Sequence, residues 1–187
     1  MQKRKHSGML VGLMSLGVLS AAALTAPPTQ AAIGNGPYYA EPAWDQTLPA
    51  VARFMNLNNF AGAAVLDRET GLVWERSPEA PTSPPTWNQA IFGCINKTTG
   101  GRKGWRLPSI PELASLIDPS VSPGPTLPAG HPFTNVQSAF YWSATTSAVL
   151  STAAWRVFFG NGGVDVSDKD GTFHAWCVRG AMNADAY

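Results

Sequence analysis

The residues of this chain best suited to chemistry are two cysteines, Cys94 and Cys177. Their thiols could form a disulfide, act as nucleophiles or bind a metal. A reactive thiol needs a basic partner and a metal site needs further ligands, and the sequence offers neither at a matching spacing. Since we expect the protein to be exported into an oxidising compartment, we predict a Cys94–Cys177 disulfide that closes a loop of about 84 residues.

Histidine and aspartate supply the other candidate metal ligands. Neither His131 nor His174 has a second ligand at the spacing typical of zinc sites. Asp165, Asp168 and Asp170 lie close together in the sequence, but they lack the regular spacing and terminal Glu of an EF-hand calcium loop. We therefore predict no metal site and no cofactor. We interpret the three aspartates as polar residues of a solvated hairpin, and calcium binding there stays open.

We expect a ligand-binding face, if the domain has one, in the loops from Asn161 to Thr172. Loops on a rigid scaffold usually carry recognition. The candidate ligand-binding residues are Asn161, Asp165, Asp168, Asp170 and His174. The sequence does not identify the ligand.

Arg106 and Glu112 could form a catalytic or ligand-binding pair. However, Ser109 and Glu112 have the spacing of a capping box, in which each side chain satisfies a free amide at a helix start. We interpret Glu112 as a helix cap, and Arg106 as its local partner with a stem that packs beside Trp105. The chain has no Gly-x-Ser-x-Gly elbow, Walker loop or dinucleotide fingerprint, so we predict that it is not an enzyme.

Two helices should position these residues. Thr86 and Gln89 form a capping-box pattern, and the apolar residues that follow lie at helical spacing: Trp87, Ala90, Ile91, Cys94 and Ile95. This pattern predicts a helix with Cys94 on its buried face. The second helix should begin at Ser109 and bury Ile110, Leu113, Ala114 and Ile117.

The remaining elements should be strands joined by turns. Val65 to Trp74 predicts a hairpin around the turn Arg68–Gly71. The last third predicts one antiparallel sheet with strands at Phe140–Thr145, Trp155–Phe159, Val164–Ser167 and Phe173–Arg179. Asn161-Gly162 indicates a type I′ turn, and Asp118–Thr134 a long ordered loop. Helices and strands together predict an α+β domain, with Trp142, Trp155 and Trp176 mostly in its core.

The chain begins like a secretory signal. Three basic residues at positions 3–5 precede an apolar run, and small residues end at Ala31, where we expect cleavage. We divide the chain into a signal peptide (1–31), a leader (32–59), one domain (60–180) and a tail (181–187), with no membrane span after cleavage. Removing three of the 13 Lys and Arg but none of the 12 Asp and Glu leaves 10 − 12, or −2. We see no Lys/Arg cluster, so we predict no nucleic-acid binding.

Four sequence blocks mark the predicted elements: Ala64–Trp74, Gly104–Pro108 with Glu112-Leu113, Tyr141–Thr145, and Trp176–Gly180. In this order, over about residues 60 to 180, they resemble the C-terminal domain of the Legionella collagen-like adhesin. This resemblance implies a C-type-lectin-like fold, related to the formylglycine-generating enzyme, in which two helices flank a twisted antiparallel sheet. It also implies structural roles for the motif residues Trp105, Arg106, Glu112, Trp142, Trp176 and Arg179.

The adhesin of this resemblance binds sulfated polysaccharides, but the present chain lacks a collagen-like stalk and its mature part is acidic. Fold transfers better than function. We expect an exported, non-catalytic module, periplasmic or secreted, that recognises a glycan or a surface or envelope partner. The alternatives are a structural or assembly subunit of an envelope complex and a divergent oxidative enzyme of the formylglycine-generating type. The oligomeric state stays open.

Overall fold

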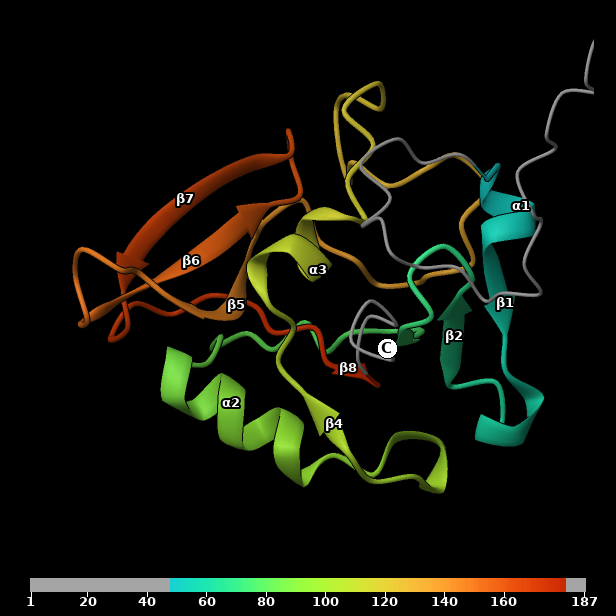
Figure 1. Ribbon diagram of the computed structural model, residues 1–187, viewed down its shortest axis with the longest axis horizontal. Coiled ribbons are helices and arrows are strands. Elements are labelled where there is room, and N and C mark those ends of the chain that lie inside the picture. Colours follow the sequence, from blue (N-terminus) through green and yellow to red (C-terminus); the bar gives the residue numbers. More distant parts are fainter. Residues whose placement is uncertain (1–47, 181–187) are drawn as a thin grey trace, which may run out of the picture. The chain divides into compact units, whose positions relative to one another are not determined.

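The computed structural model describes residues 48–180 (Figure 1). The predicted signal peptide, residues 32–47 of the predicted leader and the predicted tail lie outside the described residues. In chain order the elements are α1 (Ala50–Arg53), β1 (Phe54–Asn56), the 3-10 helix η1 (Asn58–Phe60), β2 (Ala64–Asp67), β3 (Val73–Glu75), α2 (Trp87–Asn96), the 3-10 helix η2 (Thr99–Gly101), β4 (Trp105–Arg106), α3 (Ile110–Ala114), β5 (Phe140–Thr146), β6 (Ala153–Phe158), β7 (Gly163–Asp168) and β8 (Val178–Arg179). The predicted α+β class is confirmed. None of the helices within residues 48–180 is long and apolar enough to cross a bilayer.

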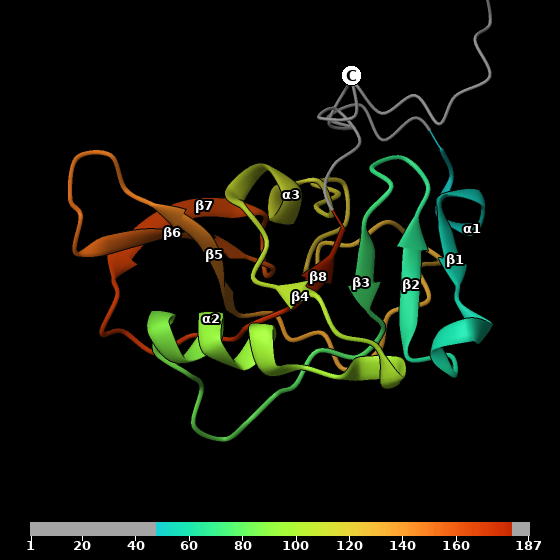
Figure 2. The same ribbon diagram turned by 60° about the horizontal axis from the view of Figure 1, so that its bottom comes forward.

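The strands form two antiparallel sheets and not the single sheet that we predicted for the last third of the chain. One has the order β1-β2-β3-β8-β4 and the other the order β5-β6-β7 (Figures 1 and 2). The predicted strand from Phe173 to Arg179 is wrong in extent, because only its last two residues form β8. Those two residues leave the second sheet and pair with β3 and β4 of the first.

The first predicted hairpin is confirmed, and the second differs in its turn. β2 pairs with β3 around a turn in which Gly71 has a φ of 74°. Between β6 and β7, a type I′ turn would need positive φ at both Asn161 and Gly162, but only Gly162 has it, at 80°. The connection is a four-residue turn closed by a hydrogen bond from the Gly162 amide to the Phe158 carbonyl (2.8 Å).

Both predicted helix starts are confirmed by capping boxes. The Gln89 side chain accepts from the Thr86 amide (2.9 Å), and the Glu112 carboxylate accepts from the Ser109 amide (2.8 Å). The predicted buried stripe of α2 is wrong at its end, because Ile95 is 55% exposed. Cys94, one position earlier, is buried as predicted.

Two apolar clusters lie on opposite faces of the sheets. Neighbouring residues of one strand enter different clusters: Trp74 and Tyr141 lie in the first, and Val73 and Trp142 in the second. Successive side chains of a strand point to opposite faces, so each sheet separates the two clusters. α2 packs against β4 and β5 on one side, and α3 packs against β5 and β6 on the other (Figure 2). The predicted core positions of Trp142 and Trp176 are confirmed.

The first sheet begins before residue 60. Residues 50–56, which we assigned to the leader, form α1 and the edge strand β1. They are held by Arg53, whose side chain is fully buried and donates two hydrogen bonds to Asp67 (2.9 and 2.8 Å) and one to the Ser115 carbonyl (2.9 Å). Glu69 also contacts this guanidinium, at 3.1 Å. A buried ion cluster therefore fastens α1 to the first hairpin.

Candidate functional site

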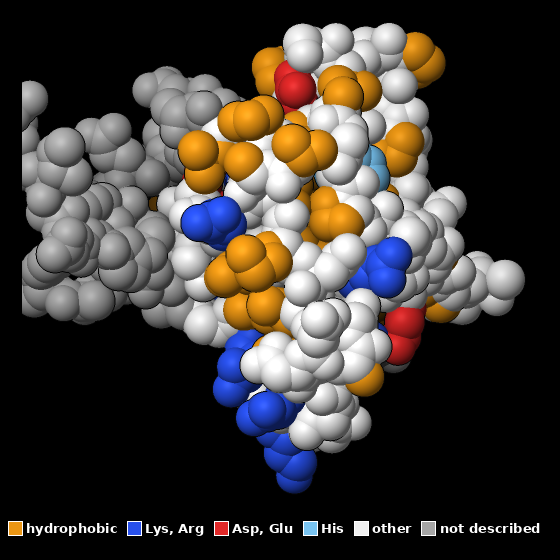
Figure 3. Space-filling model, turned by 90° about the vertical axis from the view of Figure 1, so that its right-hand side faces the viewer, with side chains coloured by type: hydrophobic (Ala, Val, Ile, Leu, Met, Phe, Trp, Pro, Cys, Tyr) orange, Lys and Arg blue, Asp and Glu red, His pale blue; other side chains and the backbone are white. Residues whose placement is uncertain are grey.

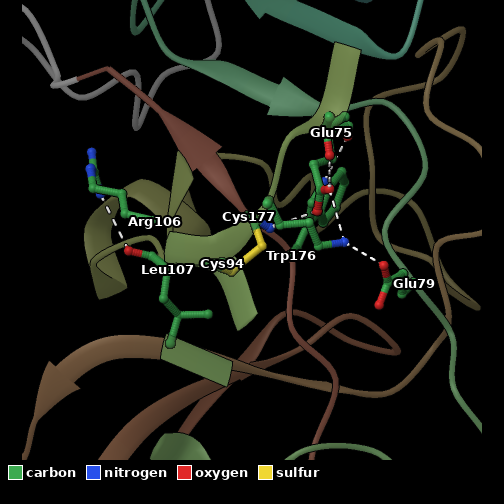
Figure 4. The surroundings of a disulfide bond; sticks show 9 residues. Glu75, Glu79, Cys94, Arg106, Leu107, Trp176 and Cys177 are labelled. Atoms are coloured by element: carbon green, nitrogen blue, oxygen red, sulfur yellow. Dashed lines mark hydrogen bonds and ion pairs between the residues drawn. A yellow bond between two sulfur atoms is a disulfide. The ribbon is translucent and has the colours of Figure 1, made fainter. Parts of the chain in front are cut away.

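The predicted disulfide is present. The Cys94 and Cys177 sulfurs are 2.05 Å apart, and both residues are buried. The bond joins α2 to the residue before β8. Figure 4 shows Arg106 and Leu107 on one side of it and Glu75, Glu79 and Trp176 on the other. Both thiols are thus committed to a structural bond.

A buried carboxylate lies beside the disulfide. Glu75 is 2% exposed, and its side chain accepts from the Cys177 amide (3.2 Å) and from the Thr99 hydroxyl (2.8 Å). Its charge is compensated by Lys97, whose amine lies 3.1 Å from Glu75 and 2.7 Å from the exposed Glu79. The Lys97 amine therefore bridges one buried and one exposed carboxylate.

Lys97 and Glu79 also border three adjoining hollows. The two larger ones have volumes of about 460 and 470 Å³. We call these two hollows together the Lys97 cleft. It is lined by Gly62, Ala63, Glu75, Arg76, Ser77, Glu79, Gly93, Asn96, Lys97, Thr98, Thr99 and Thr134. The lining contains hydroxyl, amide, carboxylate and cationic groups.

Cations gather on the other side of the disulfide, at the edge strand β4. Register brings Arg179 of β8 opposite Trp105 of β4, and the Arg179 guanidinium donates to the Lys103 carbonyl (2.9 Å). We define the basic edge as Arg102, Lys103, Arg106 and Arg179. Our expectation of no Lys/Arg cluster is wrong, because sheet pairing joins Arg179 to three cations that lie within five residues of one another.

Aromatic rings support the basic edge. The guanidinium carbons of Arg102 and Arg179 lie 5.6 and 5.7 Å from the centre of the buried Phe60 ring. The indole of Trp105 donates to the Arg102 carbonyl (2.8 Å) and so fixes the loop before β4. In Figure 3, which views the molecule from the right-hand side of Figure 1, a group of Lys and Arg side chains lies at the lower end, with no acidic side chain among them.

Within residues 48–180, Arg106 differs from the other three cations because it has a carboxylate partner. Its guanidinium donates to both oxygens of Glu112 (2.7 and 2.6 Å) and to the Gly180 carbonyl (2.7 Å). Our interpretation of Glu112 as a helix cap with a local arginine partner is thus confirmed. Arg106 also binds the backbone at Gly180, the residue directly after β8.

The charge on Glu112 should stabilise the fold in a pH-dependent way. Burial alone would raise the pKa of Glu112, but hydrogen bonds from Arg106 and the Ser109 amide outweigh it and hold the pKa below the ordinary value of 4.5. We expect Glu112→Gln to lower the free energy of unfolding by about 2 kcal/mol near neutral pH, because two charge-assisted bonds are weakened. A group whose folded pKa is depressed stabilises above its unfolded pKa and loses that effect as pH falls through its folded pKa. The difference between the two proteins in urea denaturation should therefore shrink below pH 4.5; a difference that stays constant with pH would contradict this assignment.

The structure does not gather the predicted ligand-binding residues into one site. Asn161 precedes β7 and accepts from the Gly163 amide (2.9 Å), whereas Asp168 and Asp170 lie at the other end of that six-residue strand. At roughly 3.3 Å per residue, these ends are about 17 Å apart. Within the described part of the chain, no group of three or more His, Cys, Asp or Glu side chains could hold a metal ion.

Asp165 and His174 have local structural partners. Asp165 accepts from Arg156 (2.9 Å), whose guanidinium carbon lies 3.8 Å from the Phe140 ring and 4.2 Å from the Phe173 ring. His174 lies against the Tyr141 ring, with centroids 5.2 Å apart. Burial lowers the pKa of His174, and a backbone hydrogen bond with Glu79 opposes this shift. These contacts stabilise the second sheet.

Taken together, the chain forms a disulfide-closed α+β domain of two sheets, with a polar cleft on one side of the disulfide and a basic edge on the other. The chain belongs to the Lcl C-terminal domain family, which it matches over residues 63–179. This confirms the resemblance drawn from the four sequence blocks, and the C-type-lectin-like assignment stays a prediction. No curated protein matches the chain.

Proposed function

We propose that this protein is an exported, non-catalytic module that binds an anionic glycan through the basic edge. The observation that carries the proposal is that strand pairing brings Arg179 to the end of the sheet where Arg102, Lys103 and Arg106 lie, and that within residues 48–180 Arg106 alone of these four has a carboxylate partner, Glu112. Residues 48–180 contain ten Lys and Arg and nine Asp and Glu, a balance of +1. The described domain is therefore not acidic, although the whole predicted mature chain has a negative net charge. Membership of a family of adhesin-associated domains supports a binding role.

The disulfide supports the two other parts of this proposal, namely that the protein is exported and that it is not an enzyme. Disulfides form and persist in oxidising compartments, which agrees with export. Both cysteines of the chain are bonded to each other, so neither thiol is free for the oxidative chemistry of the alternative enzyme hypothesis.

Heparin binding by the purified protein tests this function, with unsulfated dextran as the neutral comparison. We expect heparin to bind, and its affinity to fall steeply when NaCl is raised, because the polymer must displace its counterions. Lys103→Glu should lower the affinity about tenfold, since it replaces an attractive charge in the contact with a repulsive one. Calorimetry or surface plasmon resonance measures both effects.

Arg68→Glu is the matched control, because Arg68 is an exposed cation in the turn between β2 and β3 and outside the basic edge. It changes the net charge by the same amount and should leave heparin affinity near the wild-type value. Equal losses in the two variants would show that net charge, and not the basic edge, determines binding. Absence of heparin binding to the wild-type protein would refute the anionic-glycan proposal.

A second candidate, a subunit that packs against an envelope protein, is favoured by the opposite edge of the first sheet. β1 is a terminal strand, and the exposed fractions of Leu48, Val51 and Met55 are 37%, 80% and 45%. Figure 3 shows hydrophobic side chains spread over this face. Exposed sheet edges with apolar side chains often pair with other chains. Co-purification of a fixed partner from the native envelope, lost in a Val51→Asp variant, would favour this role.

A further inference from the structure

The Lys97 cleft has the chemistry of a site for an uncharged, hydroxyl-rich ligand. Its lining holds two carboxylates, Glu75 and Glu79, and two cations, Arg76 and Lys97. The other polar lining groups are the hydroxyls of Ser77, Thr98, Thr99 and Thr134 and the amide of Asn96. The charges balance, so neither an anion nor a cation is favoured, while donors and acceptors are both abundant.

Lys97 still has hydrogen-bonding capacity for a ligand. An ammonium group has three N–H donors, and the Lys97 amine forms ion pairs with Glu75 and Glu79. Glu79 is 75% exposed at its side chain, so its carboxylate faces solvent at the rim of the cleft. Figure 4 shows Glu75 and Glu79 lying on the same side of the disulfide. A hydroxyl placed between them can accept from the amine and donate to the rim carboxylate.

Gly93 keeps the α2 side of the cleft open. It lies inside a ten-residue helix, where glycine is less favourable than alanine. Its φ is not positive, and a Cβ placed on it would meet no atom within 4 Å. Neither backbone conformation nor packing therefore requires glycine here. What its missing side chain provides is space, because Gly93 lines the cleft.

An exposed aromatic ring lies on α2, the helix that borders this space. Phe92 is 64% exposed and lies one helical turn before Asn96, on the same face of α2. Aromatic faces pack against the C–H face of a sugar ring, and the adjoining polar groups can bond its hydroxyls. We propose that the Lys97 cleft binds one sugar ring of a neutral glycan. This site is distinct from the basic edge and takes a ligand of different charge.

Saturation-transfer NMR with glucose, galactose, mannose and N-acetylglucosamine tests the proposal on the full exported chain. We expect at least one of these sugars to bind with an affinity that does not change between low and high NaCl. Gly93→Leu fills the cleft and Phe92→Ala removes the ring, so each should weaken that binding at least tenfold.

Two variants on the same helix serve as matched controls. Asn88→Leu adds the same side chain as Gly93→Leu at an exposed position outside the cleft lining, and Ile95→Ala truncates an exposed apolar residue as Phe92→Ala does. Both controls should bind like the wild type, and heparin binding should be unchanged in all four variants. The proposal is overturned if none of the four sugars binds, if Gly93→Leu or Phe92→Ala binds like the wild type, or if the controls lose as much affinity. Loss of heparin binding alone would instead count against the basic edge.

Discussion

A protein in which both Cys94 and Cys177 are replaced by serine should be less stable by about 4 to 5 kcal/mol in the free energy of unfolding. The two residues are 83 positions apart, and a bridge that closes so long a loop strongly restricts the unfolded chain in the chain-entropy model. Both side chains are also buried in the apolar cluster between α2 and the first sheet. Urea denaturation without reductant, monitored by tryptophan fluorescence, measures this difference in the free energy of unfolding.

Reduction of the wild-type protein is the internal comparison for that experiment. With dithiothreitol present, the wild type should unfold at nearly the same urea concentration as the double serine variant, because both lack the bridge. If the wild type kept its midpoint after complete reduction, shown by thiol titration, the disulfide would not be a main determinant of stability.

The second large effect is expected at Arg53. Arg53→Met should lower the free energy of unfolding by about 3 to 5 kcal/mol, because it leaves the carboxylates of Asp67 and Glu69 buried without their cation. Those carboxylates are fully or almost fully buried and contact the guanidinium at 2.8 to 3.1 Å. Chemical denaturation at neutral pH measures this loss. Hydrogen exchange should further show weakened protection of the amides in β1, since Arg53 directly precedes that strand.

Arg68→Ala is the control for Arg53→Met, because Arg68 is exposed and lies next to Asp67 in the sequence. A surface substitution of this kind should change stability by less than about 0.5 kcal/mol. A small loss for Arg53→Met, similar to that of the control, would mean that the packing of α1 and β1 does not depend on the buried ion cluster.

Local patterns in the sequence predicted the helix starts and the first hairpin. Thr86 with Gln89 and Ser109 with Glu112 form bonds between residues three positions apart, so the sequence spacing alone specifies them. The disulfide could be predicted because only two cysteines exist.

The errors in the fold arose where the outcome depends on distant segments. β8 was expected in the last sheet, but its neighbours are β3 and β4, which precede it by more than 70 residues. Ile95 has the helical spacing of a buried residue, but its side chain is 55% exposed. Alternation and helical periodicity show which side chains share a face, and they do not show what that face packs against.

The candidate sites could be predicted only in part for the same reason. Arg102, Lys103 and Arg106 are close together in the sequence, but the negative net charge of the whole mature chain pointed away from a basic surface. Arg179 joins them only through strand pairing. The Lys97 cleft combines η2, the end of α2 and the segment after β3, and no motif in the sequence marks this combination. The predicted hairpin residues are near one another in sequence but are separated by an extended strand.

The two edge strands of the first sheet, β1 and β4, differ in the side chains that they carry. One margin, β1, carries aliphatic side chains, and the other, β4, carries positive charge. Four strand spacings of roughly 4.8 Å separate them, or about 19 Å. Under the two proposed roles, a polysaccharide lying along β4 would leave β1 free, so one domain of this size could hold a polysaccharide and a protein partner simultaneously.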